Sequence, residues 1–127
     1  MSKAVLDASA LLAMLQGEPG ADAVEDVVPD AVMATINLAE VLQKLVDSGA
    51  PEHEAFAAVA GLGIGFVDVD VGLARGSARL RDSTRKVGLS LGDRVCLALG
   101  EQLDVPLLTT DRAWGGLGLA LKVHVVR

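Results

Sequence analysis

The order of the predicted elements is the feature that most restricts how this chain can fold. Short runs rich in valine, leucine and isoleucine alternate with longer segments whose apolar residues recur at helical spacing. Strands are predicted over 3–6, 31–34, 64–70, 106–109 and 122–126. Helices are predicted over 9–16, 22–28, 36–47, 52–60, 72–86 and 92–103. This alternation predicts an α/β fold: a five-stranded parallel sheet with helices on both faces.

Residues that favour turns and caps mark the ends of these predicted helices. Gly17 follows the first helix, and Gly49 follows the helix over 36–47. Thr35 is expected to cap the amino end of that second helix. No linker, repeat or low-complexity segment interrupts the pattern, so residues 1–127 are predicted to form one domain.

Charge, cysteine content and hydropathy narrow the class of protein further. The formal net charge is −6, so the chain as a whole does not attract nucleic acid or an anionic membrane. The one cysteine, Cys96, rules out an internal disulfide and lies in an apolar stretch typical of a buried structural thiol. No apolar run approaches the roughly 20 residues of a spanning helix. We therefore expect a cytoplasmic protein that makes no membrane contact.

One segment departs from the acidic balance of the chain. Residues Arg75 to Lys86 include four arginines and one lysine, against the single acid Asp82. A solvated helix face explains such a run on its own. A nucleic-acid role for a protein of this net charge would need a local patch of this kind.

Carboxylates follow the predicted strands at the edge where parallel sheets bind ligands. Asp7 directly follows the first strand, and Asp111 follows the fourth. Glu40 lies in the first turns of the helix after the second strand, on the same face as Asn37. Asp93 opens the last predicted helix. Because ligands bind beyond the carboxyl ends of such strands, we expect these acids to converge.

Each acid also has a structural explanation when taken singly. Ser90 to Asp93 fits a capping pattern, Glu40 suits a helix surface, and Asp111 suits the start of a turn. Asp7 is harder to explain in this way. It ends an apolar strand that is expected to be central, where an ionised carboxylate needs a partner.

The four acids taken together point to a bound cation. At a separation of ~5 Å and an effective dielectric constant of about 20, each pair of carboxylates repels by roughly 3 kcal/mol. Such a cluster needs raised pKa values or a divalent cation. Hard oxygen ligands suit Mg²⁺ or Mn²⁺. Zinc is disfavoured because His53 and His124 have no ligand-like spacing.

Four stretches of the chain resemble the PIN domain family, specifically the small VapC-type toxins of prokaryotic toxin–antitoxin pairs. They are VLDASALLAML (5–15), TINLAEVLQKL (35–45), LSLGDRVCLALG (89–100) and PLLTTDRAW (106–114). Together they extend the similarity over essentially the whole chain. The resemblance implies a PIN-like fold and a Mg²⁺-dependent endoribonuclease that hydrolyses RNA phosphodiester bonds.

The resemblance also implies roles for individual residues. The metal-binding and catalytic acids would be Asp7, Glu40, Asp93 and Asp111, which we call the acidic quartet. Within it, Asp7 and Asp93 would be the most direct metal ligands. The residues that would orient the acids or the attacking water are Thr110, Ser9 and Asn37. No acid of the family pattern is missing.

The partners implied by the resemblance are an RNA substrate, a cognate antitoxin protein and a second copy of the chain in a homodimer. The segment over 75–86, together with Arg94 and Arg112, is a candidate for holding RNA phosphates. Whether one metal ion or two would bind is left open.

One alternative class of function stays open, and several others are disfavoured by the residues. A non-catalytic PIN-like module that binds RNA or protein would keep the same pattern. A HAD-like phosphatase would need D-x-D-x-T where this chain has DASAL, and a receiver domain would need a lysine after the last strand. The glycine pattern GLGIG at 61–65 precedes a strand, which is the wrong order for a nucleotide-binding loop.

Overall fold

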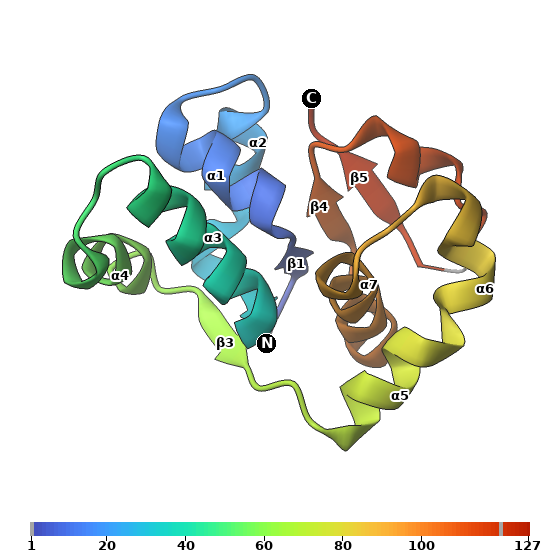
Figure 1. Cartoon of the computed structure of the whole chain (residues 1–127). Helices are drawn as coiled ribbons and strands as arrows, with labels where there is room; N and C mark the ends of the chain where they lie inside the picture. Colours follow the sequence, from blue (N-terminus) through green and yellow to red (C-terminus); the bar gives the residue numbers. More distant parts are fainter. Residues whose placement is uncertain (1, 120) are drawn as a thin grey trace.

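A parallel sheet of five strands forms the centre of the molecule (Figure 1). The computed structural model describes residues 2–119 and 121–127. In chain order the strands are β1 (Ala4–Leu6), β2 (Ala31–Ala34), β3 (Gly65–Val67), β4 (Leu107–Thr109) and β5 (Val123–Val125). Their order across the sheet is β3-β2-β1-β4-β5, and every neighbouring pair is parallel.

Helices pack against both faces of this sheet (Figure 1). One side carries α1 (Ala8–Gln16), α2 (Ala21–Val27), α3 (Thr35–Asp47) and α4 (Glu52–Ala60). The other side carries α5 (Val71–Arg79), α6 (Arg81–Thr84) and α7 (Leu91–Leu103). Short 3₁₀ turns complete the chain: η1 (Val28–Asp30), η2 (Arg85–Val87) and η3 (Arg112–Gly116). Among these described helices, none has the length and apolarity needed to cross a membrane.

Alternate residues of β1 contribute to two separate apolar clusters. Val5 packs in the cluster that contains Leu73 of α5, whereas Leu6 packs in the cluster that contains Leu11 of α1. Both strand residues are completely buried. As predicted, β1 is therefore a central strand covered on both faces. The next residue, Asp7, leaves the sheet at its carboxyl edge.

The chain reverses its direction across the sheet between β1 and β4. From β1 it proceeds outward to β2 and β3, and it then crosses to β4 and β5 on the opposite side. A reversal of this kind opens a crevice beyond the carboxyl ends of the two central strands. The register pairs Leu6 with Leu108, so the residues that follow β1 and β4 meet at this crevice.

The predicted α/β fold and its five parallel strands are confirmed, but the predicted cap of α3 is wrong. Thr35 does not occupy the N-cap position. Ala34 does, and no side chain caps this end of the helix. Thr35 is instead the first helical residue, because β2 runs directly into α3 without an intervening turn.

The single helix predicted over 72–86 is also wrong, because the helix breaks at Leu80. The hydroxyls of Ser83 and Thr84 both donate to the Leu80 carbonyl, at 3.2 and 2.7 Å. Such bonds from serine and threonine back to the preceding turn bend helices. Leu80 is buried at the break, so the bend keeps an apolar side chain in the core. The basic residues of this segment are thereby divided among α5, α6 and η2.

The strand predicted over 64–70 is shorter in the structure. β3 ends at Val67, and the following residues are used to start α5. The carboxylate of Asp70 accepts a hydrogen bond from the Leu73 amide at 2.9 Å and caps the helix. This local capping bond replaces the last part of the expected strand.

Candidate acidic active site

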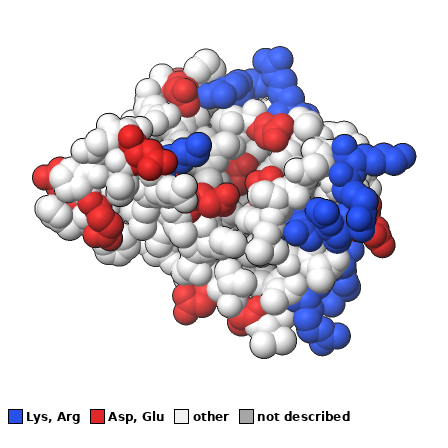
Figure 2. Space-filling view, in the orientation of Figure 1, with Lys and Arg blue, Asp and Glu red and all other residues white. Residues whose placement is uncertain are grey.

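A pocket of about 220 Å³ opens beyond the carboxyl ends of the central strands. The residues that line it are Asp7, Ala8, Ser9, Leu12, Glu40, Lys44, Asp93, Asp111 and Trp114. All four members of the acidic quartet are among them. Figure 2 shows acidic side chains gathered in a hollow near the middle of this face of the molecule. The structure therefore brings together the four acids that the sequence distributes over more than 100 positions.

Asp7 is the most buried acid of the pocket, with 4% of its surface exposed. Its Oδ1 accepts hydrogen bonds from the Ser9 hydroxyl at 2.7 Å and the Ala10 amide at 2.8 Å. Its Oδ2 accepts a hydrogen bond from the Thr109 hydroxyl. Burial raises the pKa of Asp7 from 3.8 to about 6, these three bonds oppose the rise, and the charge of Asp93 adds to it. The bonds hold the carboxylate in one orientation.

Thr109 connects the ends of β1 and β4. Besides donating to Asp7, its hydroxyl oxygen accepts a hydrogen bond from the Asp111 amide at 3.1 Å. Thr109 is completely buried. Thr110, the threonine selected from the sequence, instead donates its backbone amide to the Ser9 hydroxyl at 3.1 Å. Sequence reasoning missed Thr109 because two adjacent threonines at a strand end cannot be told apart without the strand register.

Glu40 is held against the start of α7 by Asn37. The Asn37 amide nitrogen donates to Glu40 Oε1 at 2.9 Å and to the Gly92 carbonyl at 3.1 Å. Asn37 is 1% exposed, so this bridge between α3 and α7 is shielded from water. Its own side-chain oxygen has no hydrogen-bond partner within the described residues. The expected proximity of Asn37 and Glu40 on one helix face is thus observed.

Asp93 has a structural contact as well as a place in the pocket wall. Its Oδ2 accepts a hydrogen bond from the Ser90 amide at 3.0 Å, and its own amide donates to the Ser90 hydroxyl at 3.1 Å. These reciprocal bonds form the capping box that the sequence predicts. They use one carboxylate oxygen, and the other makes no hydrogen bond within the described part of the chain. Capping and ligand binding are therefore compatible at this residue.

Asp111 is the capping residue directly before the turn η3, and it also lines the pocket. Its Oδ1 accepts a hydrogen bond from the Ala113 amide at 3.0 Å, and its side chain is exposed. Trp114, three residues further on, is 2% exposed and also lines the pocket. Sequence reasoning did not include Trp114, although its place in the stretch PLLTTDRAW was visible.

Lys44 is the basic residue of the pocket lining. It lies four residues after Glu40 on α3, so both side chains project from the same helix face. Arg94 and Arg112, which the sequence offers as candidates for holding RNA phosphates, do not line the pocket. The i, i+4 spacing from Glu40 was the signal that would have found Lys44.

Three acids of the quartet act together on the nearby thiol of Cys96. Burial, and after it the negative charges of Asp7, Asp93 and Glu40, raises the pKa of the Cys96 thiol well above its ordinary value. Cys96 is completely buried, which confirms its predicted structural place. The three acids thus contribute to one region of negative potential.

The carboxylate oxygens of the pocket suit a hard cation, although the acidic side chains do not form a closed ligand cage. Across residues 2–119 and 121–127, no group of three or more His, Cys, Asp or Glu side chains is arranged to hold a metal ion. Mg²⁺ commonly binds through one or two carboxylates and keeps several waters, so it does not need such a cage. His53 and His124 are exposed and do not line the pocket. The chemistry of the pocket therefore fits Mg²⁺ or Mn²⁺ better than zinc.

Comparison with solved structures finds toxin–antitoxin proteins. A toxin–antitoxin complex from Klebsiella pneumoniae is 21% identical, covering 91% of this chain and 93% of its own, with a TM-score of 0.75. A member of the VapBC family from Mycobacterium tuberculosis is 25% identical, covering 100% and 99%, with a TM-score of 0.65. A second M. tuberculosis protein, a VapC described as a sarcin–ricin loop cleaving toxin, is 14% identical, covering 93% and 97%, with a TM-score of 0.72.

Comparison with protein families agrees with the fold. No curated protein matches the chain. The family profile described as PIN domain matches residues 4–117, a span that contains the whole acidic quartet. That match covers most of the sequence. The chain belongs to the PIN domain family.

Proposed function

We propose that this protein is a metal-dependent endoribonuclease and the toxin of a type II toxin–antitoxin pair. The observation that carries the proposal is the pocket itself, in which four acids from separate elements line one space of about 220 Å³. A structural role alone would not require four carboxylates to line one pocket, because their mutual repulsion is unfavourable. A divalent cation bound among these carboxylates would offset their repulsion and could then attract a phosphodiester substrate.

Three acids of the quartet have a carboxylate oxygen available for a cation. Glu40, Asp93 and Asp111 each use one carboxylate oxygen in a hydrogen bond within the described residues. In each case the second oxygen remains for a ligand. Asp7 is the most rigid member and would hold one side of the cation. Mg²⁺ bound there would lower the pKa of a coordinated water and neutralise the charge that develops on the phosphate.

The remaining residues would orient these acids and the substrate. Thr109 and Ser9 fix the Asp7 carboxylate by hydrogen bonds. Thr110 would act as a positioning residue through the hydrogen bond that its backbone amide donates to the Ser9 hydroxyl. Lys44 lies in the pocket wall, where its ammonium group would approach a phosphate oxygen of the substrate. Trp114 would close the apolar side of the pocket and exclude water.

The comparisons support the choice of substrate and partner. The K. pneumoniae and M. tuberculosis neighbours are described as toxin–antitoxin proteins, and one is described as cleaving the sarcin–ricin loop. We therefore propose an RNA substrate and a cognate antitoxin for this chain, with a homodimer as its assembly. Mg²⁺ is the proposed cofactor, and Mn²⁺ is expected to replace it because both take oxygen ligands.

RNA cleavage with and without metal tests the proposal. The wild-type protein should cleave RNA with Mg²⁺ or Mn²⁺ and should stop when EDTA is added. Asp7→Asn should abolish cleavage, whereas Asp26→Asn, an exposed acid on α2 outside the pocket, should not. Cleavage that persists in Asp7→Asn would contradict the proposed site. RNA binding without cleavage under every metal condition would favour the alternative, a non-catalytic PIN-like binding module.

A further inference from the structure

Charge is strongly segregated along this chain and over its surface. Residues 1–60 contain ten acids and only two basic residues, Lys3 and Lys44. Residues 75–94 contain six basic residues and only two acids. Figure 2 shows most of the basic side chains of this face gathered on the right, the side that carries α5 and α6 in Figure 1, while the hollow with the acids lies near the middle. A local positive potential therefore stands next to the acidic pocket in a protein of net charge −6.

Three of these basic side chains project into solvent from α6 and η2. Arg81, Arg85 and Lys86 are all exposed. Arg85 contacts Asp82 at 3.2 Å, but the two side chains are 61% and 95% exposed. An ion pair as exposed as this one contributes little and is readily exchanged for another anion. The break at Leu80 turns this group away from α5, so that it forms a cluster of its own.

Arg94, near the start of α7, adds a further cation on the side of the sheet that carries α5 and α6. It is the residue after Asp93 and is half-buried. Its guanidinium lies 3.4 Å from the Ser77 carbonyl on α5 and 3.4 Å from the Ser90 carbonyl at the start of α7. These two contacts leave part of the planar donor set unused. Arg94 thus bridges α5 and the start of α7 and keeps further N–H groups for a phosphate.

We propose that Arg81, Arg85, Lys86 and Arg94, here called the basic patch, bind the phosphate backbone of RNA on one side of the scissile bond. This inference rests on the proposed function of the pocket. The patch offers charge and guanidinium donors but no aromatic side chain, since residues 75–94 contain none. It therefore binds RNA mainly through the phosphate charges and offers no aromatic platform for bases, so its contribution should depend little on base sequence and strongly on salt.

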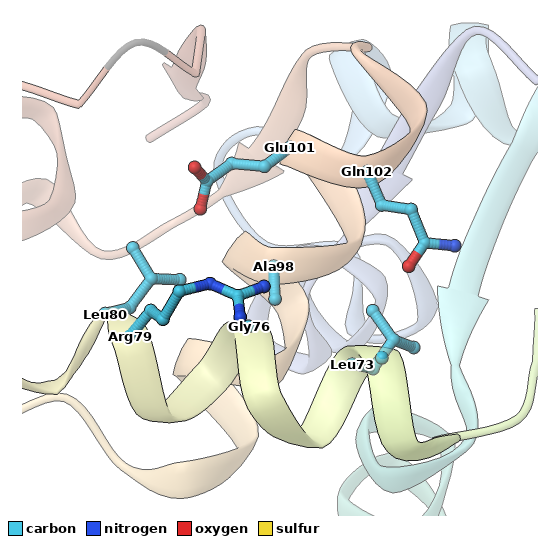
Figure 3. A pocket seen from close by; sticks show the side chains of 8 residues that line it. Leu73, Gly76, Arg79, Leu80, Ala98, Glu101 and Gln102 are labelled. Atoms are coloured by element: carbon cyan, nitrogen blue, oxygen red, sulfur yellow. The ribbon is translucent and has the colours of Figure 1, made fainter.

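Arg79 belongs to the same segment but has a different environment. It lies across a groove of about 530 Å³ between α5 and α7, with Glu101 and Gln102 on the opposite wall (Figure 3). A phosphate entering this groove would face the carboxylate of Glu101 and be repelled. Arg79 is therefore outside the basic patch, although it carries the same charge. It provides a matched control for the loss of one arginine.

The test measures RNA binding in the full chain carrying Asp7→Asn, with EDTA present so that no cleavage occurs. The probe is a fluorescein-labelled single-stranded RNA of about 20 nucleotides, titrated between about 50 and 200 mM KCl. Adding R81Q, R85Q and K86Q together should weaken binding about tenfold or more at the lowest salt. The slope of log Kd against log salt should fall by about 2, since each lost phosphate contact on a single strand contributes about 0.7. R79Q should change Kd less than about twofold.

The outcomes separate this inference from the proposed function. Weaker binding and a smaller slope in the triple variant, with R79Q unchanged, support the patch even if the wild-type protein cleaves no RNA. Unchanged binding and slope overturn it, even if cleavage by the wild-type protein is normal. A slope that falls by about 0.7 in R79Q, one third of the change in the triple variant, would also overturn it, because the effect would then follow net charge alone. All three substituted residues are exposed, so unchanged thermal unfolding is expected and is measured alongside.

Discussion

Gly92 of α7 lies so close to Glu40 of α3 that a Cβ atom at position 92 would stand 2.6 Å from Glu40 Oε1. The approach is possible only because glycine has no side chain. The Asn37 amide fills the space beside it by donating to both Glu40 and the Gly92 carbonyl. The position of one acid of the pocket therefore depends on the absence of a methyl group on the neighbouring helix.

Gly92→Ala should impair the site without unfolding the protein. The added methyl group meets the flexible end of Glu40, so the carboxylate should move while the helices stay in place. A displacement of about 1 Å in an active site can cost on the order of 100-fold in rate. We expect a loss of this size in RNA cleavage and weaker Mg²⁺ binding, measured by kinetics and by the shift of thermal unfolding with Mg²⁺.

A second glycine at the same helical position provides the control for this substitution. Gly72 is the second residue of α5, as Gly92 is of α7, and a Cβ there would make only an ordinary contact of 3.4 Å with Asp70. Gly72→Ala should raise stability slightly, by about 0.5–1 kcal/mol, and leave cleavage unchanged. Equal cleavage by Gly92→Ala and the wild-type protein would show that the position of Glu40 does not matter for the reaction.

Mg²⁺ should stabilise the wild-type protein against heat. A ligand that binds only the folded state adds about 2.7 kcal/mol at a concentration 100 times its Kd. Asp7→Asn should remove this gain, because it replaces the most rigid carboxylate of the pocket by an amide. Thermal unfolding with and without Mg²⁺ measures the effect, and Asp26→Asn is the matched control. A stabilisation that survives in Asp7→Asn would place the bound ion elsewhere.

The stability of the metal-free protein should depend on pH through Asp7. Its pKa rises from 3.8 to about 6 on folding, so the folded state binds the proton more tightly than the unfolded chain does. Stability should therefore fall as pH increases from about 4 to about 6 and then remain lower. The difference amounts to roughly 3 kcal/mol when a shift of this size is converted to free energy.

Asp7→Asn isolates this contribution in EDTA. At pH 8 the variant should be more stable than the wild-type protein, by up to about 3 kcal/mol, because the buried charge is gone. At pH 4 the advantage should disappear, since Asp7 is then protonated in the folded state. Urea unfolding at the two pH values measures both differences. The assignment of this pH dependence to Asp7 would be untenable if Asp7→Asn stabilised the protein equally at pH 4 and pH 8.

Thr109→Val should affect Asp7 and Asp111 together. The substitution keeps the shape of the side chain but removes the hydroxyl that donates to Asp7 and accepts from the Asp111 amide. Loss of two buried hydrogen bonds should cost about 1–3 kcal/mol of stability. The pKa of Asp7 should rise further, because the Thr109 bond lowers it in the native protein. The acid limb of the cleavage–pH profile should therefore move to higher pH.

Thr110→Val provides the comparison at the neighbouring position. Thr110 contacts Ser9 through its backbone amide, which valine retains. Its effect on stability and on the pH profile should therefore be smaller than that of Thr109→Val. The reverse order would mean that the hydroxyl of Thr110, and not that of Thr109, controls the acids.

The sequence alone determined the features of this protein that depend on local pattern. Apolar periodicity and the positions of turns predicted a five-stranded parallel α/β fold, and the observed sheet confirms it. The Ser90–Asp93 capping box was also predictable, because capping involves residues three apart. The expected convergence of the acids followed from a general property of parallel sheets, and all four line one pocket.

Only the tertiary structure decided which side chains meet across elements. Thr109 reaches Asp7 because of the register between β4 and β1, and Gly92 meets Glu40 because of how closely α7 packs on α3. The break at Leu80, which separates the basic patch from Arg79, depends on hydroxyl bonds that compete with an otherwise regular helical pattern. Periodicity specifies which face of an element is apolar. It does not specify register or spacing between elements, because these arise from side chains far apart in the chain packing against each other.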